Sequence, residues 1–316
     1  MIISASRRTD IPAFYGQWLL KRLEEGYVCV RNPMNRNQVS RIRLDRDTVD
    51  CIVLWTKNPE PMLPLLPRLD AMGFPYYFQF TLTAYGKDLE PGLPEKSRLT
   101  DLFWELSDRL GPARVVWRYD PVVISGSWTV SRHLKAFGQL AEDLKGASDT
   151  CVVSFLDRYR KIEKRLDRLG LRPPDDAEQK CFLREAAGMA AGAGMTVETC
   201  SEEGEFASLG VRRGSCISRE RIREITGREV TAPEDRTQRP NCGCVKSVDI
   251  GMYDTCSHGC VYCYASRSQE LIRKNMENSR PDSPFLSGGL DGREKITERD
   301  MPSVLAPAAF NHQGME

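Results

Sequence analysis

Three cysteines near the end of the chain could bind a metal cluster: Cys256, Cys260 and Cys263. They lie in the run Cys-Ser-His-Gly-Cys-Val-Tyr-Cys, with three residues in the first gap and two in the second. Cysteine thiolates hold [4Fe–4S] clusters, and a cluster held by protein alone needs four of them. Three thiolates would leave one iron open, and an open metal position can bind a substrate or cofactor.

The same thiols could instead belong to a zinc site or to an electron-transfer cluster. Structural zinc sites usually have four closed ligands, often in paired CxxC arrangements. A bacterial ferredoxin run has two residues in each of its first gaps, unlike the spacing found here. The spacing therefore favours an open [4Fe–4S] cluster over both alternatives.

With Tyr262 directly before the last cysteine, the motif resembles the signature of the radical S-adenosylmethionine (SAM) superfamily. The resemblance extends roughly from Met1 to Ser268, and the cysteine motif is its specific part. It implies that the open iron binds the amino and carboxylate groups of SAM, and that the reduced cluster cleaves SAM to a 5′-deoxyadenosyl radical. The signature normally lies near the start of the barrel, so its late position here implies a rarer bacterial branch with a permuted order.

The resemblance also implies partners. A low-potential electron donor of the flavodoxin or ferredoxin type would reduce the cluster, and the radical would abstract hydrogen from a substrate. Nucleic acids, peptides and small molecules are all open as substrates. The rival interpretation is a noncatalytic iron–sulfur or zinc protein that acts in electron transfer or as a binding module.

Four other cysteines lie in polar settings: Cys200 ends a predicted strand, Cys216 follows Gly214-Ser215, and Cys242 and Cys244 lie just before the triad. We predict that these four bind a second, auxiliary [4Fe–4S] cluster. Alternatively, Cys242 and Cys244 form a redox pair or have no such role, or all four hold zinc. The remaining cysteines are interpreted as buried thiols: Cys29, Cys51, Cys151 and Cys181.

The elements that would position these cysteines alternate between strand and helix. Short apolar runs predict strands, and segments with helical spacing lie between them. The predicted strands are 2–6, 51–55, 76–83, 115–121, 151–156 and 195–200. The alternation favours a complete or partial (β/α) barrel of mostly parallel strands, with an open doubly wound sheet as the alternative. No GxGxxG motif follows a strand, so a dinucleotide-binding fold has no support.

A further strand is predicted over 247–252, directly before the triad, and a helix over 265–275. We hypothesise that this late strand pairs beside the N-terminal strand, so that the cysteine-rich segment closes the barrel. The predicted organisation is a barrel core over 1–200, a cysteine-rich segment over 201–275, and a flexible tail over 276–316.

Active sites of (β/α) barrels are built from loops after the carboxyl ends of the strands. Arg and Lys can clamp the carboxylate of SAM, and Asp or Glu can hold its ammonium or ribose hydroxyls. The Gly-Gly-Glu type of SAM motif is missing after the first strand, and the run Ser6–Asp10 is expected to replace it. The predicted cofactor contacts are Ser6, Arg7, Arg8, Asp10, Lys57 and Tyr262, and the predicted catalytic residues are Arg118, Asp120 and Glu198. Arg118 and Asp120 could instead form a partly buried ion pair.

The bulk composition is that of an ordinary globular protein, with 41% hydrophobic and 28% charged residues among 316. The net charge of +1 gives no global basic field for nucleic acid. A basic helix predicted over 158–169 is interpreted as solvent-facing rather than as a binding surface. No apolar run has the length of a membrane span and the N-terminus lacks the layout of a signal peptide, so we expect a cytoplasmic protein with no membrane partner. In that compartment eleven cysteines should not form a disulfide framework.

Overall fold

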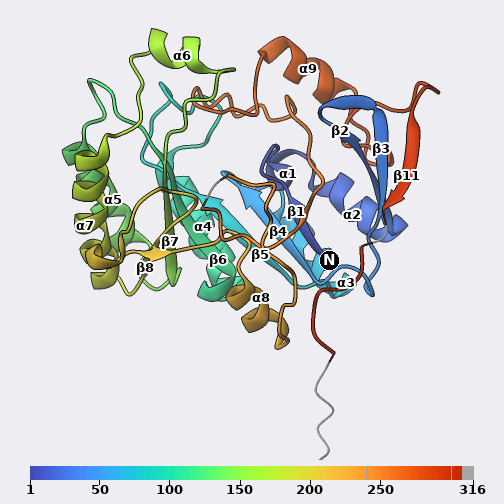
Figure 1. Cartoon of the computed structure of the whole chain (residues 1–316), viewed down its shortest axis with the longest axis horizontal. Coiled ribbons are helices and arrows are strands. Elements are labelled where there is room, and N and C mark those ends of the chain that lie inside the picture. Colours follow the sequence, from blue (N-terminus) through green and yellow to red (C-terminus); the bar gives the residue numbers. More distant parts are fainter. Residues whose placement is uncertain (240, 300, 308–316) are drawn as a thin grey trace, which may run out of the picture.

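An eight-stranded sheet lies at the centre of the computed structural model, which describes residues 1–239, 241–299 and 301–307 (Figure 1). The strand order is β10-β1-β4-β5-β6-β7-β8-β9, and every neighbouring pair is parallel. The strands are β1 (Ile2–Ala5), β4 (Cys51–Thr56), β5 (Tyr76–Thr81), β6 (Val115–Val122), β7 (Thr150–Phe155), β8 (Thr196–Thr199), β9 (Arg212–Arg213) and β10 (Val248–Asp249). The chain therefore has the predicted α/β fold with a mostly parallel sheet.

The central strands are buried on both faces, as parallel strands usually are. All four residues of β1 and all six of β7 are buried, and the apolar runs that predicted these strands supply the side chains. On one face, aromatic side chains such as Phe78, Phe80 and Trp117 pack against the helices. On the other face, Val53, Tyr77, Val116 and Val152 pack against the segment that follows β9.

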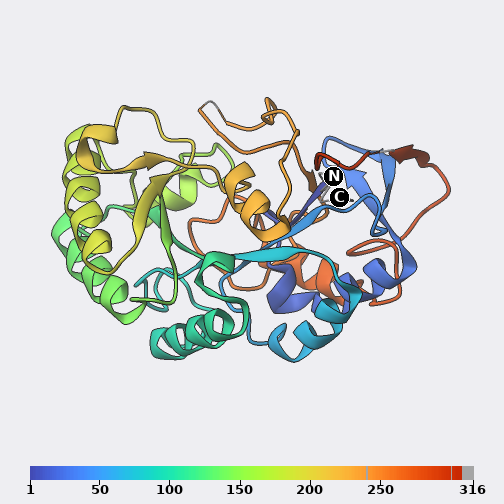
Figure 2. The ribbon, with the colours of Figure 1, turned by 90° about the horizontal axis from the view of Figure 1, so that it is seen from below.

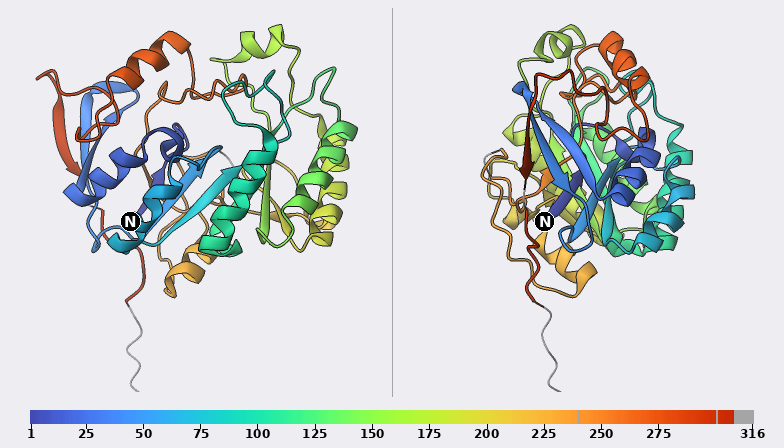
Figure 3. Two further views of the ribbon diagram at one scale, coloured as in Figure 1. Left: turned by 180° about the vertical axis from the view of Figure 1, so that it is seen from behind. Right: turned by 90° about the vertical axis from the view of Figure 1, so that its right-hand side faces the viewer.

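Helices connect the strands in order, and Figure 3 shows α3 and α4 lying across the back of the sheet. Most begin or end with a recognisable signal. A capping box of Asp175 and Glu178 starts α7, and the left-handed Gly26 ends α2. The helices are α1 (Ile11–Phe14), α2 (Gly16–Glu25), α3 (Leu66–Met72), α4 (Lys96–Leu110), α5 (Val130–Asp143), α6 (Glu163–Arg168), α7 (Asp176–Gly192), α8 (Arg219–Thr226) and α9 (Gln269–Glu277), with 3₁₀ turns η1 (Leu63–Leu65), η2 (Pro112–Arg114) and η3 (Ala207–Leu209).

Of the predicted complete or partial barrel, the complete form is wrong, because the sheet is an open arc that the cysteine-rich segment does not close with strand pairing in the described residues (Figure 2). The late strand β10 does pair beside β1, with Ile3 opposite Val248 and Ser4 opposite Asp249. However, the edge strands β9 and β10 do not pair with each other in the described residues. Each of these strands has only two residues, so they have few backbone groups with which to hydrogen-bond and close the sheet. The segment between them instead packs its apolar side chains inside the arc.

A second sheet has the order β11-β3-β2 and lies on the side of the main sheet that holds β1 (Figure 1). The antiparallel strands β2 (Tyr27–Asn32) and β3 (Asn35–Arg43) form a hairpin. The strand β11 (Lys295–Arg299), which the sequence did not predict within the range 276–316, pairs parallel with β3. Every residue of β11 is exposed, so backbone pairing supports it and no apolar pattern could reveal it. Residues 300 and 308–316 lie outside the described residues.

The predicted division at residue 200 does not separate two sheets. Strands from both sides of that boundary share the central sheet, because β9 and β10 flank strands of the first segment. Within the described ranges, no helix has the length and apolarity that crossing a membrane requires.

The buried His133 should make the fold sensitive to mild acid. His133 is fully buried on α5, 2.9 Å from the Tyr119 hydroxyl and 2.8 Å from the Val123 carbonyl oxygen. Burial lowers its pKa to about 4, against 6.5 in the unfolded chain. The folded state therefore binds its proton less readily, so the stability is complete above pH 6.5 and is lost as the pH falls toward 4. We expect a loss of about 2 kcal/mol at pH 5 from this residue.

Denaturant unfolding of the wild type and of His133→Asn at pH 7 and pH 5 measures this loss. Between pH 7 and pH 5, the free energy of unfolding of the wild type should fall by about 2 kcal/mol more than that of the variant. Equal pH dependence in both proteins would show that His133 does not carry the effect.

Candidate functional site

The cysteine loop 256–263 follows β10 at the carboxyl end of the sheet, next to the loop that follows β1. The Asp249 carboxylate joins the two loops. It accepts hydrogen bonds from Ser6 Oγ at 2.6 Å, the Arg7 backbone N–H at 2.9 Å and Arg8 Nε at 3.1 Å. A Cβ on Gly251 would lie 2.0 Å from Ser6 Oγ, so this close approach requires glycine. The predicted cofactor residues Ser6 and Arg8 thus hold the strand that leads into the cysteines.

Asp10 holds the cysteine loop from the same side. Its carboxylate accepts from the Lys57 backbone N–H at 2.7 Å and lies 2.8 Å from His258 Nε2. A carboxylate can only accept, so the Nε2 atom carries the hydrogen. In the neutral imidazole this leaves a lone pair on Nδ1, which is buried and has no hydrogen-bond partner among the described residues.

His258 lies in the first gap of the triad. Its ring is buried and paired with Asp10. Histidines that bind metals commonly donate their other ring N–H to a carboxylate. His258 therefore has the arrangement of a metal ligand, two residues after Cys256.

A buried carboxylate, Glu90, braces the other end of the loop. It accepts from Lys57 Nζ at 2.8 Å and Thr83 Oγ1 at 3.0 Å, and also from Lys96 and the Tyr262 hydroxyl. Burial opposes ionisation, but the charges of Lys57 and Lys96 outweigh it and lower the Glu90 pKa to about 2. Glu90 lies in a loop between β5 and α4, and sequence analysis gave it no role. The predicted cofactor residues Lys57 and Tyr262 both donate hydrogen bonds to Glu90 in this structure.

The backbone of the Glu90 loop also contacts the cysteine loop. The Gly92 N–H donates to the His258 carbonyl oxygen at 2.8 Å, and the Val261 N–H donates to the Leu89 carbonyl oxygen at 3.0 Å. A Cβ on Gly92 would lie 2.6 Å from that His258 oxygen. Both ends of the cysteine loop are therefore fixed by neighbouring loops at the carboxyl end of the sheet.

The triad thiols are largely withdrawn from solvent. Burial raises the pKa of Cys260 to about 12, although Lys57 opposes the effect. Burial, followed by the Asp10 charge, raises the pKa of Cys256 well above that of a free thiol. Both should be protonated without metal, so metal binding would release protons. The triad sulfurs do not all lie within 4.8 Å of one another in the described structure.

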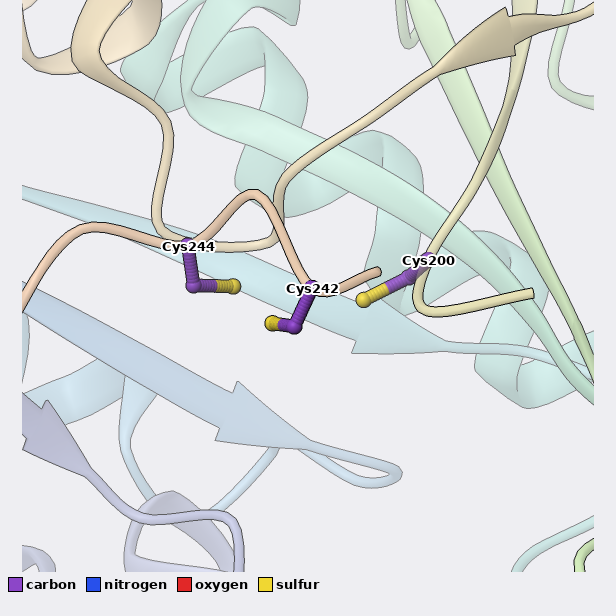
Figure 4. A group of neighbouring side chains, drawn as sticks. All are labelled: Cys200, Cys242 and Cys244. Atoms are coloured by element: carbon purple, nitrogen blue, oxygen red, sulfur yellow. The ribbon is translucent and has the colours of Figure 1, made fainter. Parts of the chain in front are cut away.

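The structure brings together the other four predicted ligands. The sulfurs of Cys200, Cys242 and Cys244 all lie within 4.8 Å of one another and point toward one another (Figure 4). Cys216 Sγ lies 3.0 Å from Cys200 Sγ. Hydrogen bonds with Cys200 and Cys244, and then the charges of Arg118 and Arg7, hold the pKa of Cys216 well below its usual value despite burial. We call these four residues the cysteine quartet.

Arg118, predicted as catalytic, joins the quartet to the polar side chains of the inner face. Its Nη1 donates to Cys216 Sγ at 2.7 Å and to Gln79 Oε1 at 3.2 Å, and its Nη2 pairs with Asp120. Ser154 Oγ donates to Asp120 at 3.1 Å. Arg118 and Asp120 therefore form the ion pair that was the alternative to a catalytic role. Arg118 of this pair also contacts the candidate metal ligand Cys216.

Arg7 lies on the other side of the quartet. Its guanidinium lies 5.2 Å from the centre of the Trp55 ring, and that of Arg118 lies 5.1 Å from the same ring. Burial lowers the Arg7 pKa, but Cys244, Asp249 and the other quartet sulfurs outweigh it and raise the pKa overall. Its Nη2 atom is buried without a hydrogen-bond partner in the part of the chain that the structure describes.

Glu198, the third predicted catalytic residue, lies apart from this network. It packs against Gly214, where a Cβ would lie 2.6 Å from the Glu198 Cβ. Burial raises its pKa, and the charges that oppose this most are Arg221 and Arg212. No hydrogen bond in the described residues joins Glu198 to Arg118 or Asp120.

Residues 2–265 match the model of the family described as a domain of unknown function, DUF1848. The chain belongs to the DUF1848 family. The matched range includes the whole sheet, the cysteine triad and the quartet, so both cysteine groups of this DUF1848 protein lie within the family domain. No curated protein matches the chain. Among solved structures, it is similar to a protein from Bacteroides thetaiotaomicron described as an alpha-L-fucosidase, with 12% identity and a TM-score of 0.23, over 72% of this chain and 84% of that chain. That likeness is too low to bear on fold or activity.

Proposed function

We propose that this DUF1848 protein is a radical SAM enzyme in which Cys256, Cys260 and Cys263 hold a [4Fe–4S] cluster with one open iron. The observation that carries the proposal is the position of the triad. Its loop is fixed at the carboxyl end of a parallel sheet, where α/β proteins bind their ligands, by two buried carboxylates. Three thiols in one partly buried loop are donors of the kind that such clusters use.

The open iron requires that no fourth side chain binds it. Among the described residues the quartet has its own grouping, and Cys29, Cys51 and Cys151 lie in packed cores. His133 is engaged by Tyr119 and Val123. Among the cysteine and histidine side chains that the structure describes near the triad, His258 Nδ1 is the buried atom without a hydrogen-bond partner, so the proposal depends on this residue.

Protein side chains near the triad have the charges that SAM requires. Lys57 and Arg8 are the nearby cations that would attract the SAM carboxylate, and each would have to turn from the carboxylate that it pairs with, Glu90 and Asp249 respectively. When bound, the cluster would supply the electron that cleaves SAM reductively. On the inner face of the sheet, Arg118 and Asp120 would then contact the substrate. We expect the donor to be a flavodoxin or ferredoxin type of protein and the setting to be the reducing cytoplasm.

The Asp10–His258 pair favours one second function. If His258 Nδ1 closed the cluster as a fourth ligand, the iron could not bind SAM, and the protein would be a noncatalytic electron carrier. The two functions predict opposite results for the same variant.

The test is the anaerobic incubation of reconstituted, reduced protein with SAM, followed by quantitation of 5′-deoxyadenosine, for the wild type and for His258→Ala. The proposal expects product from the wild type, and product from the variant within about tenfold of it, since His258 then only supports the loop. Product from the variant alone, or from neither protein with the cluster fully loaded, would favour the electron carrier.

A further inference from the structure

We propose that the cysteine quartet binds a single tetrahedral metal ion of the Zn²⁺ class, and that this ion bridges the two open edges of the sheet. The four ligands would be Cys200, Cys216, Cys242 and Cys244. The ligands of this site are separate from the triad, and the site shares with the proposed function only Arg118, which contacts Cys216.

The spacing of the sulfurs carries the choice of a single ion. Four thiolates at about 2.3 Å from one zinc ion lie roughly 3.8 Å from one another in a tetrahedron. The Cys200 and Cys216 sulfurs are 3.0 Å apart, and those of Cys200, Cys242 and Cys244 all lie within 4.8 Å of one another. In a [4Fe–4S] cluster each cysteine binds a different iron, so its sulfurs lie farther apart than those around one ion. Three of the sulfurs thus lie close enough to share one ion and the fourth, that of Cys216, touches Cys200, which differs from the wider spacing of the auxiliary cluster that the sequence suggested.

The surroundings balance the charge of such a site. A divalent ion with four thiolates carries a net charge of about −2, which is costly to bury without compensation. The guanidinium of Arg118 contacts Cys216 Sγ at 2.7 Å, and that of Arg7 lies beside the quartet with a buried, unsatisfied Nη2 among the described residues. The Ile217 backbone N–H also donates to Cys244 Sγ at 3.4 Å. Outer contacts of this kind fix metal ligands in place.

The position of the quartet in the fold indicates what the ion would do. Cys200 directly follows β8, and Cys216 follows β9 at one edge of the sheet. Cys242 and Cys244 precede β10 at the opposite edge. The gap between these edges has no strand pairing in the described residues, and the chain that spans it packs its apolar side chains on the inner face. Four closed ligands are typical of structural zinc sites, so the ion would complete the arc where hydrogen bonds do not.

Metal analysis of a protein without the triad tests the site separately from the proposed function. In the full chain with Cys256→Ala, Cys260→Ala and Cys263→Ala, we expect about one metal ion per chain and no acid-labile sulfide. Exchange for Co²⁺ should give the absorption bands of a tetrahedral tetrathiolate. Adding Cys242→Ser and Cys244→Ser should abolish both signals. Four irons with sulfide, or no bound metal, would overturn the proposal.

A second measurement does not depend on the folding of the triad variant. In a chain with the triad intact, Cys242→Ser with Cys244→Ser should lower zinc by about one ion per chain while leaving iron unchanged. Amide hydrogen exchange over 200–247 should then become at least about tenfold faster, whereas β4 and β5 keep their rates and serve as the internal control. Unchanged exchange over 200–247, or a parallel loss of iron, would contradict a separate bridging ion.

Discussion

A Cys260→Ala variant, reconstituted with iron and sulfide and then reduced, is expected to release no 5′-deoxyadenosine from SAM above the buffer level. Cys260 is the most buried thiol of the triad, and its removal leaves two sulfurs to hold the proposed cluster. Loss of outer-shell contacts alone costs metal sites 10–100-fold, so loss of a direct ligand should lower activity by on the order of 100-fold or more. Quantitation of product and of triad iron measures both effects.

The matched control is Cys181→Ala, because Cys181, which was wrongly predicted to be buried, is an exposed thiol on α7, outside both cysteine groups. This variant should keep the iron content and the activity of the wild type. If Cys260→Ala kept its iron and its product, the triad would not be the cluster site.

Replacement of Glu90 by Gln should cost roughly 3–5 kcal/mol of stability, because it removes the anion from a buried charge network. The Glu90 side chain is 1% exposed and pairs with Lys57 and Lys96, which are 16% and 26% exposed. The variant would leave two cations near the triad without their partner. It would also weaken the anchor of Tyr262, so the cysteine loop should become the first part of the fold to lose protection from exchange.

The same change has a defined pH dependence. The folded pKa of Glu90, about 2, lies below the unfolded value of 4.5, so its stabilisation is complete above pH 4.5 and is lost as the pH falls through 2. Unfolding of the wild type and of Glu90→Gln should differ most at pH 7 and converge toward pH 2. Glu60→Gln is the control, since its half-exposed pair with Arg98 should contribute less than about 1 kcal/mol. A Glu90→Gln protein as stable as this control would show that the network does not support the fold.

Local patterns were sufficient for most of the fold. The apolar runs at 51–55, 76–83 and 151–156 predicted strands that are buried on both faces. The polar residues directly after each predicted strand also indicated which loops lie at the carboxyl end of the sheet. The pairing of β10 beside β1 was predictable from the family resemblance, which implies that the cysteine loop follows the strand at the start of the core.

The remaining features depend on contacts that leave no local signal. The two-residue edges that keep the sheet open cannot be told from loop in the sequence, and β11 is held by backbone pairing and an exposed ion pair of Glu298 with Arg41 rather than by apolar packing. The partners of Asp249 named above are more than 200 residues away, and Glu90 pairs with Lys57 and Tyr262 from distant segments as well as with the nearby Thr83 and Lys96, so the local sequence does not show that either carboxylate joins two loops. His258 is similar, because its importance arises from Asp10 at the other end of the chain.

The most direct test of the central claim is electron–nuclear double resonance of the reduced triad cluster with isotope-labelled SAM. If the three thiolates leave an iron open, the cluster should show hyperfine coupling to the ¹⁵N amino group and the ¹⁷O carboxylate of bound SAM. Coupling to ¹⁵N of labelled histidine, with none to SAM, would show that His258 fills that iron and would contradict the account.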